Sequence, residues 1–592
     1  MLDLKITAGT IVDGSGNPRF RGDVGVKNGH VVAIGKVTQE AHETIDATDR
    51  IVAPGFIDAH THYDAQVFWD PTISPSCYHG VTTVIGGFCG FSIAPMSTEA
   101  TDYLMRMLAR VEGMPLETLR TAVPWNWRSF GEFLSSIDGK IGLNAGFFAG
   151  HSAIRRVVMG KRAVGEKSTP DELEKMKALL GESLAEGALG FSTTISKTHN
   201  DGDGNPVPSR WADYSEILEL GRVVSQYEGT GLELLPGNFN PDTIQLMADL
   251  SVAGNRPVNW NALLLIGKQD GPRALSYLAV SDQARSRGGE VIALTPATPP
   301  NVIVNFKSGA NIDANPGIWP ELFKWPLHQR IVALRDPKMR ERMAADVATV
   351  PDDSLMKFFA RLEDFRVESV KAEKNKKYIG GRIGDIGKKE GRKPIDVMLD
   401  IALDDDLDAG FATNFGGDDY EGYQLRSQLW RDDRTLIGAS DAGAHLDQID
   451  TFAYSTTVLQ KGVRAHRVIT LEEAIYQMSD RPARYFGLID RGLLRPGYHA
   501  DIVIFDERTI ARGPTYYRYD VPGNQFRVYA DAEGIDHVLV NGVPILRQGK
   551  HTGHMPGVVF RSGRDTRTVL PGAMREDRVV EFTGSVTFVA AI

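Results

Sequence analysis

A pair of histidines two residues apart is the feature that most constrains this chain. His60 and His62 belong to the stretch PGFIDAHTHYD (residues 54–64), which follows a short apolar segment at residues 51–53. This pattern predicts a β-strand entered through a Pro-Gly corner, and alternate side chains of a strand lie on one face. Two imidazoles on one face can bind a single transition-metal ion such as zinc. The alternative is a pair of histidines on a solvated strand face; the apolar segment and the flanking Asp58 favour a metal site.

The length and composition describe an ordinary globular protein with more than one hydrophobic core. The chain has 592 residues, of which 42 % are hydrophobic and 24 % charged, and a formal net charge of −10. These values argue against a nucleic-acid-binding surface. Only two cysteines, Cys77 and Cys89, are present, which does not match a secreted disulfide framework.

No targeting or membrane signal is visible in the sequence. No apolar run is long enough to span a membrane, and the first residues lack the charged start and apolar core of a signal peptide. We therefore expect a cytoplasmic protein that acts on a small-molecule substrate, with no nucleic-acid or membrane partner. The sequence is also compatible with a homo-oligomer.

Both ends of the chain carry short strands. Residues 4–34 contain alternating apolar runs with Asn28-Gly29 between two of them, and residues 500–546 repeat this pattern with Asn541-Gly542. An Asn-Gly pair between such runs is a strong hairpin signal. Neither set of strands can bury a sheet alone. We therefore predict a small β-sandwich domain built from residues 1–54 and 488–562.

The intervening segment, residues 55–487, alternates strand-like and helix-like stretches. Thr169-Pro170-Asp171-Glu172 has the capping signature of a helix that runs to about Ala185. Together with the strand before His60, the strand candidates lie near residues 82–85, 143–148, 189–192, 231–235, 257–261, 290–294 and 435–439. Eight strands alternating with helices predict an α/β fold, a (β/α)8 TIM-like barrel.

Two segments do not belong to this alternation. The chain between the last two strand candidates is longer than one barrel unit needs, so we expect an insertion around residues 300–395. Residues 563–592 lose the pattern, and we expect them to form a C-terminal extension.

The last strand candidate ends at Asp441. The carboxyl ends of the strands form the active site of a (β/α)8 barrel, so Asp441 should lie near His60 and His62. A carboxylate there can complete a metal site and accept a proton from water. A helix N-cap is the alternative role. After the paired histidines we favour Asp441 as a metal ligand and the catalytic general base.

These stretches together resemble the amidohydrolase superfamily and, within it, the N-acyl-D-amino-acid deacylases (D-aminoacylases). The similarity covers about residues 4–560. PGFIDAHTHYD and RGLLRPGYHADIVIFD (residues 491–506) are typical of the superfamily, whereas GFCG (87–90) and GHS (150–152) narrow the resemblance to the deacylases. The resemblance implies a metal-dependent hydrolase that cleaves the C–N bond of an N-acyl amino acid or a similar small molecule.

The resemblance also implies that Cys89 is a metal ligand, because a cysteine at this place has that role in the family. A small buried residue in a Gly-rich turn is the alternative. The family's further ligands are histidines after the fifth and sixth strands. This chain has Leu234-Leu235-Pro236 and Asn259-Trp260-Asn261 there, so both histidines are missing. Glu233, Asn259 and Asn261 are the polar residues near those strand ends.

The remaining donors suffice for one ion, so we predict one zinc per chain, with other divalent metals as alternatives. Its ligands would be His60, His62, Asp441 and Cys89. Three further histidines are candidates for binding substrate, with structural or surface roles as the alternatives: His151, His199 and His445.

Two other functions stay open at this point. The same barrel and metal could open a cyclic amide or deaminate its substrate. The missing histidines also make a non-catalytic binding or scaffold subunit conceivable, although a scaffold has no need for the two histidines and Asp441.

Overall fold

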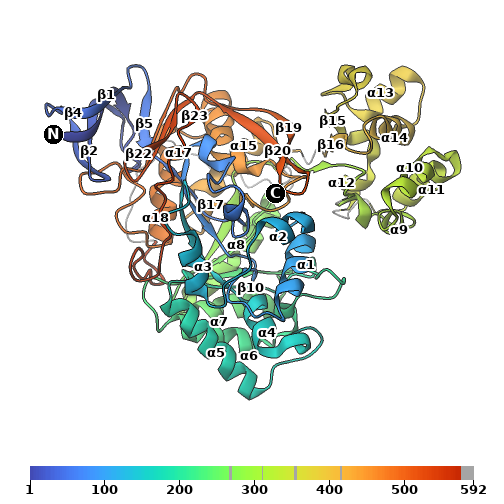
Figure 1. Cartoon of the computed structure of the whole chain (residues 1–592), viewed down its shortest axis with the longest axis horizontal. Helices are drawn as coiled ribbons and strands as arrows, with labels where there is room; N and C mark the ends of the chain where they lie inside the picture. Colours follow the sequence, from blue (N-terminus) through green and yellow to red (C-terminus); the bar gives the residue numbers. More distant parts are fainter. Residues whose placement is uncertain (266–269, 300, 310, 352–355, 414–415, 575–592) are drawn as a thin grey trace.

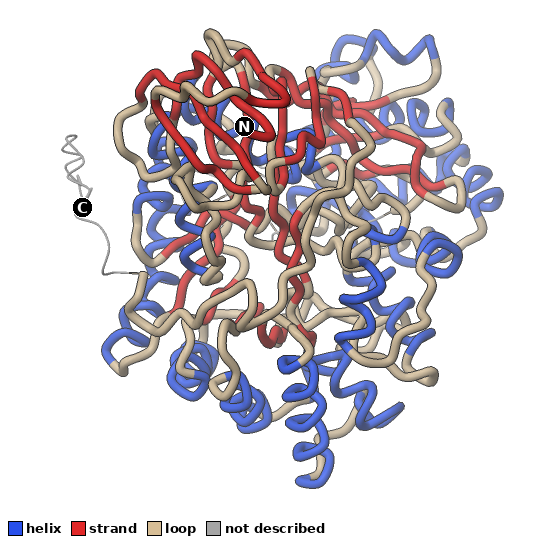
Figure 2. The backbone as a smooth tube through the Cα atoms, turned by 60° about the vertical axis from the view of Figure 1, so that its left-hand side comes forward, coloured by secondary structure: helices blue, strands red, loops and turns tan. Residues whose placement is uncertain are grey.

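Strands from the two ends of the chain share one sheet. β5 (Ile51–Pro54) pairs with β1 (Leu2–Ile11) and with β18 (Ile502–Phe505). The nine-stranded sheet has the order β23-β22-β21-β18-β5-β1-β2-β3, with β4 paired to β1. Its strands cluster at the top of Figure 2. The other bounds are β2 (Phe20–Lys27), β3 (His30–Gly35), β4 (Ala41–Asp46), β21 (Ile535–Val540), β22 (Val543–Arg547) and β23 (Lys550–His551).

Both Asn-Gly pairs form the predicted hairpins. Asn28 and Gly29 join β2 to β3 with φ angles of 50° and 78°, and Asn541 and Gly542 join β21 to β22 with 49° and 77°. Positive φ at both central positions is what a two-residue hairpin turn of type I′ requires.

Parallel strands carry the core between the chain ends. A three-stranded sheet contains β6 (Phe56–Asp58), β7 (Val81–Gly86) and β8 (Asn144–Phe147). A six-stranded sheet contains β9 (Ala149–Gly150), β10 (Gly190–Thr194), β11 (Gly231–Leu235), β12 (Val258–Trp260), β13 (Val291–Pro296) and β17 (Thr435–Gly438). Each strand candidate of this segment coincides with one of these strands.

The two parallel sheets meet at both of their edges. Phe148 alone separates β8 from β9, and an isolated parallel bridge joins Thr61, after β6, to Ala442, after β17. Within the residues that this computed structural model describes (1–574 except 266–269, 300, 310, 352–355 and 414–415), the ladders do not form one continuous closed sheet. The carboxyl ends of β6 and β17 nevertheless lie side by side.

Helices alternate with the parallel strands, and several of them surround the lower half of the molecule in Figure 1. In α5 the Thr169 side chain accepts the Glu172 N–H and the Glu172 carboxylate accepts the Thr169 N–H, so the predicted capping box is confirmed. Such a cap stabilises a helix by about 1 kcal/mol. The bounds are α1 (Thr101–Val111), α2 (Leu116–Ala122), α3 (Phe130–Ile137), α4 (His151–Met159), α5 (Pro170–Ala185), α6 (Tyr214–Val224), α7 (Pro241–Gly254), α8 (Gly271–Ser286), α15 (Tyr420–Arg431), α16 (Tyr454–Thr457), α17 (Leu471–Met478) and α18 (Asp480–Tyr485).

An inserted lobe stands at the right of Figure 1, apart from the rest of the molecule. The chain enters it through β14 (Ile303–Val304) and leaves through β16 (Gly410–Ala412), and these strands pair. Its own hydrophobic cluster includes residues from Val304 to Phe411. It also contains β15 (Arg366–Ser369), α9 (Trp319–Leu322), α10 (Leu327–Arg335), α11 (Pro337–Ala348), α12 (Lys357–Ala360), α13 (Ile383–Glu390) and α14 (Pro394–Asp404).

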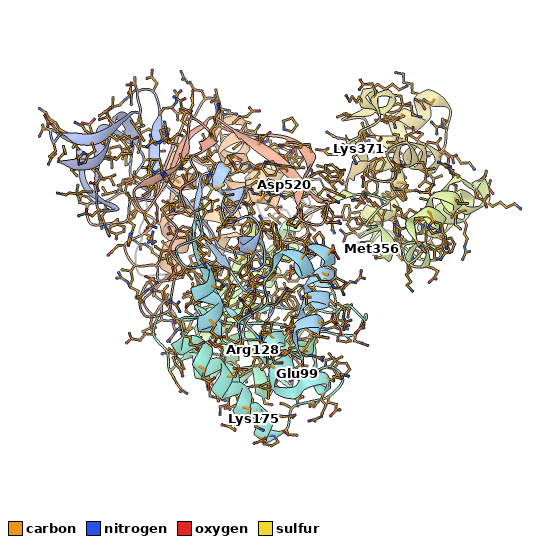
Figure 3. The ribbon with its side chains drawn as sticks, in the orientation of Figure 1. Glu99, Arg128, Lys175, Met356, Lys371 and Asp520 are labelled. Carbon is orange, nitrogen blue, oxygen red and sulfur yellow. The ribbon has the colours of Figure 1, made fainter. Side chains whose placement is uncertain are left out.

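A hairpin near the C-terminus faces this lobe. It consists of β19 (Ala511–Val521) and β20 (Gln525–Glu533). Lys371 of the lobe places its Nζ atom 4.4 Å from the ring centroid of Tyr519. Figure 3 labels Lys371 and Asp520 on the two sides of this contact.

The chain after the nine-stranded sheet packs against residues near the parallel strands. Thr566 forms a bridge with Leu488 and donates its hydroxyl to the Gly229 carbonyl at 2.7 Å. Residues 575–592, which belong to the expected C-terminal extension, lie outside the described residues. Among the described helices, none has the length and apolar character that a membrane crossing requires.

Candidate active site

His60 and His62 follow the end of β6 and are fixed by backbone and ring contacts. The His62 N–H donates to the Ala442 carbonyl at 2.7 Å, which ties this segment to the end of β17. The His60 ring stacks on Phe88 with centroids 4.6 Å apart. Both histidines are buried, and their ring centroids are 5.2 Å apart. The two imidazoles therefore lie close together in a rigid setting, as their spacing in the sequence predicts.

Cys89 joins the two histidines from the end of β7. The ligating atoms of His60, His62 and Cys89 all lie within 4.8 Å of one another, and Cys89 Sγ is 3.6 Å from His60 Nε2. The backbone of Cys89 is left-handed, with φ of 58°. A residue other than glycine keeps this conformation only where its surroundings impose it. Here its N–H donates to Glu233 Oε2 at 3.0 Å.

Asp441 completes the group. Its Oδ1 atom lies 3.2 Å from His60 Nε2 and 3.6 Å from His62 Nε2, and 41 % of the side chain is exposed. Burial opposes ionisation, but the adjacent His60 and His62 rings hold the pKa of Asp441 well below its ordinary value. The aspartate is therefore ionised, and one edge of it faces accessible space.

Glu112 is a neighbour of the site that the sequence did not reveal. It follows the last residue of α1, is buried, and places Oε2 3.6 Å from His62 Nε2. Burial works against the charge on His62, but the nearby carboxylates of Glu112 and Asp441 raise the pKa of His62 to about 9. The C-terminus of an amphipathic helix carries no motif, so only the tertiary contact identifies this glutamate.

The donor set fits a zinc ion. Imidazole nitrogen, thiolate sulfur and carboxylate oxygen are its usual protein ligands, at bond lengths of about 2.0–2.3 Å. Tetrahedral geometry at those lengths separates two ligand atoms by about 3.3–3.8 Å. The distances of 3.2, 3.6 and 3.6 Å among Asp441, His60, His62 and Cys89 are close to this spacing.

A cavity of about 750 Å³ is lined by two of the predicted substrate-binding histidines, His199 and His445. His199 packs on Phe91, with centroids 5.0 Å apart, and its Nδ1 atom is buried without a hydrogen-bond partner among the described residues. Burial lowers the pKa of His199 to about 3, so its ring is neutral. His445 lines the same cavity, and its backbone N–H donates to the Glu112 carbonyl.

The walls of this cavity come from distant parts of the chain. Residues 109–115 after α1 and residues 198–200 after β10 form one side. Lys307 belongs to the inserted lobe and Phe526 to the β19–β20 hairpin. The lobe and the hairpin thus form part of the wall of this cavity.

His151 has different surroundings. Its Nδ1 atom lies 2.9 Å from Thr193 Oγ1 and its Nε2 atom 2.8 Å from Glu216 Oε1. Glu216 also accepts from Arg155, and all of these side chains are buried. One ring nitrogen therefore contacts β10 and the other contacts α6. A role for His151 in binding substrate stays a prediction.

Replacing Glu216 by glutamine should lower the free energy of unfolding by about 3–5 kcal/mol, because it leaves the Arg155 charge buried without compensation. Urea denaturation measures this difference. Burial opposes the charge, but His151 and Arg155 lower the pKa of Glu216 from 4.5 to about 2. The stabilisation is thus complete above pH 4.5 and is lost as the pH falls toward 2.

The matched control for Glu216 is Glu219→Gln on the same helix. Glu219 pairs with Arg222 near the surface, with 35 % of its side chain exposed. This substitution should cost less than about 1 kcal/mol. Equal effects of the two substitutions would show that the buried network does not stabilise the fold.

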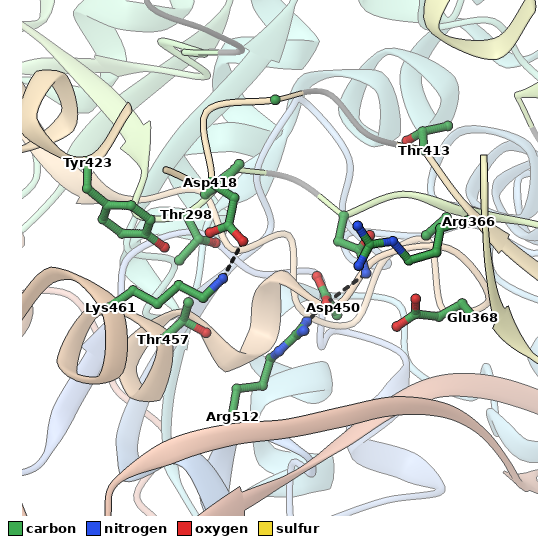
Figure 4. Close-up of a pocket in the computed structure, with 14 residues that line it drawn as sticks. Thr298, Arg366, Glu368, Thr413, Asp418, Tyr423, Asp450, Thr457, Lys461 and Arg512 are labelled. Atoms are coloured by element: carbon green, nitrogen blue, oxygen red, sulfur yellow. Dashed lines mark hydrogen bonds and ion pairs between the residues drawn. The ribbon is translucent and has the colours of Figure 1, made fainter. Parts of the chain in front are cut away.

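A second cavity, of about 200 Å³, lies between the lobe, the β19 strand and residues 457–461 (Figure 4). Asp418 pairs with Lys461 and Asp450 pairs with Arg512 on its walls. Because acidic and basic groups alternate here, this cavity does not concentrate charge of one sign.

Comparison with known proteins places this geometry in a family. The sequence profile of the Amidohydrolase family matches residues 43–546. D-aminoacylase of Alcaligenes xylosoxydans xylosoxydans is 27 % identical, with 94 % of this chain and 97 % of the relative aligned. N-acyl-D-aspartate deacylase of the same organism is also 27 % identical, over 95 % of both chains.

Solved structures agree. A crystal structure of D-aminoacylase has a TM-score of 0.63 at 23 % identity and covers 95 % of this chain and 100 % of its own, which shows a shared fold. N-acyl-D-glutamate deacylase from Bordetella bronchiseptica, solved with zinc and a phosphonate inhibitor, has a TM-score of 0.60 at 25 % identity with the same coverage. The family profile spans most of the sequence and includes both histidines and Asp441. This chain belongs to the amidohydrolase family.

Proposed function

We propose that this chain hydrolyses the amide bond of an N-acyl amino acid, most favourably of the D configuration, or of a similar small molecule. As an amidohydrolase it is a hydrolase of carbon–nitrogen bonds other than peptide bonds. The observation that carries the proposal is the convergence of His60, His62, Cys89 and Asp441. The zinc and the phosphonate mimic of a tetrahedral intermediate in N-acyl-D-glutamate deacylase support it.

The proposal includes a barrel fold and a zinc site at the ends of its strands. We propose that β6, β7, β8 with β9, β10, β11, β12, β13 and β17 form a (β/α)8-type barrel, because the Thr61–Ala442 bridge joins the outer strands. The residues at their carboxyl ends would hold one zinc per chain, with His60, His62, Cys89 and Asp441 as its ligands.

The residues of the chain have separate tasks in this reaction. When bound, a divalent metal polarises the substrate carbonyl and lowers the pKa of a water molecule. The ionised Asp441 accepts the proton of the attacking water at its exposed edge and then passes it to the leaving nitrogen. His199, whose ring is neutral, lines the cavity and would contact the substrate there. The surrounding buried side chains exclude other water.

A substrate panel tests this proposal. Zinc-loaded protein is incubated with N-acetyl-D- and N-acetyl-L-amino acids, with a hydantoin and with adenine, and the release of amine, ring-opened product or ammonia is measured. We expect release of free D-amino acids with kcat/KM of at least about 10⁴ M⁻¹s⁻¹. Turnover of only the hydantoin or adenine would assign the site to cyclic amides or deamination. Turnover of none would contradict the proposed hydrolysis.

A further inference from the structure

Two polar side chains near the strand ends where the family's histidines are missing form hydrogen bonds with Cys89. Asn261, just after β12, donates its Nδ2 amide to Cys89 Sγ at 3.1 Å. Glu233, on β11, accepts the Cys89 N–H with Oε2 at 3.0 Å. Their relative exposures are 6 % and 0 %. Glu233 thus contacts the backbone of Cys89, and Asn261 contacts its sulfur.

The direction of these bonds shows what the two side chains can do. A thiolate sulfur has only lone pairs to offer, so the amide that faces it must present its NH₂ group. Asn261 therefore directs its NH₂ group, which cannot ligate a cation, toward the sulfur, while its Oδ1 atom has no hydrogen-bond partner among the described residues. The Oε2 atom of Glu233 is likewise occupied by the Cys89 N–H, while its Oε1 atom has no hydrogen-bond partner among the described residues.

We propose that Asn261 and Glu233 are positioning residues that hold Cys89 as a ligand of a single metal ion, in place of the two histidine ligands. The proposal rests on the metal site of the proposed function. Partners that orient a metal ligand are worth about 10–100-fold in metal affinity. The backbone of Cys89 is left-handed, with φ of 58°. Glu233 stabilises this conformation, because its Oε2 atom accepts the Cys89 N–H.

The test uses cobalt(II) in place of zinc and needs no substrate. Absorption from thiolate-to-cobalt charge transfer reports the Cys89–metal bond, and titration gives the affinity and the number of ions. Asn261→Leu keeps the size of the side chain but removes the donor. We expect it to bind cobalt about 10–100-fold more weakly and to shift or lose the thiolate absorption. Asn261→Ala, which adds no bulk, is measured in parallel and should behave in the same way.

Glu233 is tested by a pair of substitutions. In Glu233→Gln the amide carbonyl can still accept the Cys89 N–H, so cobalt affinity and absorption should stay within about threefold of the wild type. Glu233→Leu loses the acceptor and should weaken binding as Asn261→Leu does. The matched control is Asn259→Leu, two residues before Asn261, because Asn259 makes no hydrogen bond to Cys89. It should leave the thiolate absorption unchanged.

Two results would overturn the proposal without touching the proposed hydrolysis. One is cobalt binding by Asn261→Leu within twofold of the wild type with unchanged absorption. The other is binding of two ions by the wild type and one by Glu233→Gln, which would make Glu233 a ligand. A folded His60→Ala variant that still binds cobalt with unchanged absorption would instead reject the metal site of the proposed function, and this proposal with it.

Discussion

Replacing Asp441 by asparagine should lower kcat/KM on the best amide substrate by about 10²–10⁴-fold, the usual loss when a general base is removed. Asparagine has nearly the same size but cannot take up the proton of the attacking water. The basis for this expectation is the position of the Asp441 carboxylate, whose Oδ1 atom lies 3.2 Å from His60 Nε2 and 3.6 Å from His62 Nε2. Steady-state kinetics on zinc-loaded protein measure the effect.

The control for Asp441 lies just before the strand that Asp441 follows. Asp433 is near the opposite end of β17, is 54 % exposed and pairs with Arg285. Asp433→Asn should leave kcat/KM within about twofold of the wild type, because surface pairs contribute little. If Asp441→Asn also retained activity within a few-fold, Asp441 would have no part in the mechanism.

Replacing His60 by alanine should have the largest effect, because it removes a metal ligand. Without the metal, the substrate carbonyl is not polarised and the pKa of the attacking water is not lowered. We expect activity to fall by about 10⁴-fold or more, to the level that a chelator produces in the wild type. The loss should not be restored by added zinc, whereas chelated wild-type protein should recover. Amide hydrolysis assays with and without added zinc distinguish these cases.

An exposed histidine provides the comparison for His60. His328 lies on the surface of α10 in the inserted lobe. His328→Ala should bind zinc and turn over substrate like the wild type. Activity of His60→Ala within tenfold of the wild type would mean that the reaction does not depend on this histidine.

Features that depend on neighbouring residues were predictable from the sequence. The Asn28-Gly29 and Asn541-Gly542 turns need positive φ angles, which these residue types tolerate, and the hairpins form there. The capping box of Thr169 and Glu172 is likewise local. His60 and His62 also lie close together, with ring centroids 5.2 Å apart, because one residue separates them in a short segment after β6.

Features that depend on tertiary contacts were harder to predict from the sequence. Glu112 contacts His62 only because the end of α1 packs beside the segment after β17. The residues around Glu112 form no motif that predicts this contact. His151 follows a family-like motif, yet its ring nitrogens are occupied by Thr193 and Glu216. A motif identifies a residue type, but the partners of a buried side chain come from other elements.

The role of Cys89 lies between these cases. Nothing local distinguishes a cysteine ligand from a small buried residue in a Gly-rich turn. The family resemblance implied a ligand, and the structure places its sulfur 3.6 Å from His60 Nε2. The replacement of two histidines near Glu233 and Asn261 was visible in the sequence, but their contacts to Cys89 were not.

The metal content of the protein tests the central claim most directly. Elemental analysis of protein purified without chelator should give about one zinc per chain in the wild type and none in His60→Ala. His60, His62, Cys89 and Asp441 provide enough ligands for one such ion. Two tightly held ions in the wild type, or zinc retained by His60→Ala, would contradict the account.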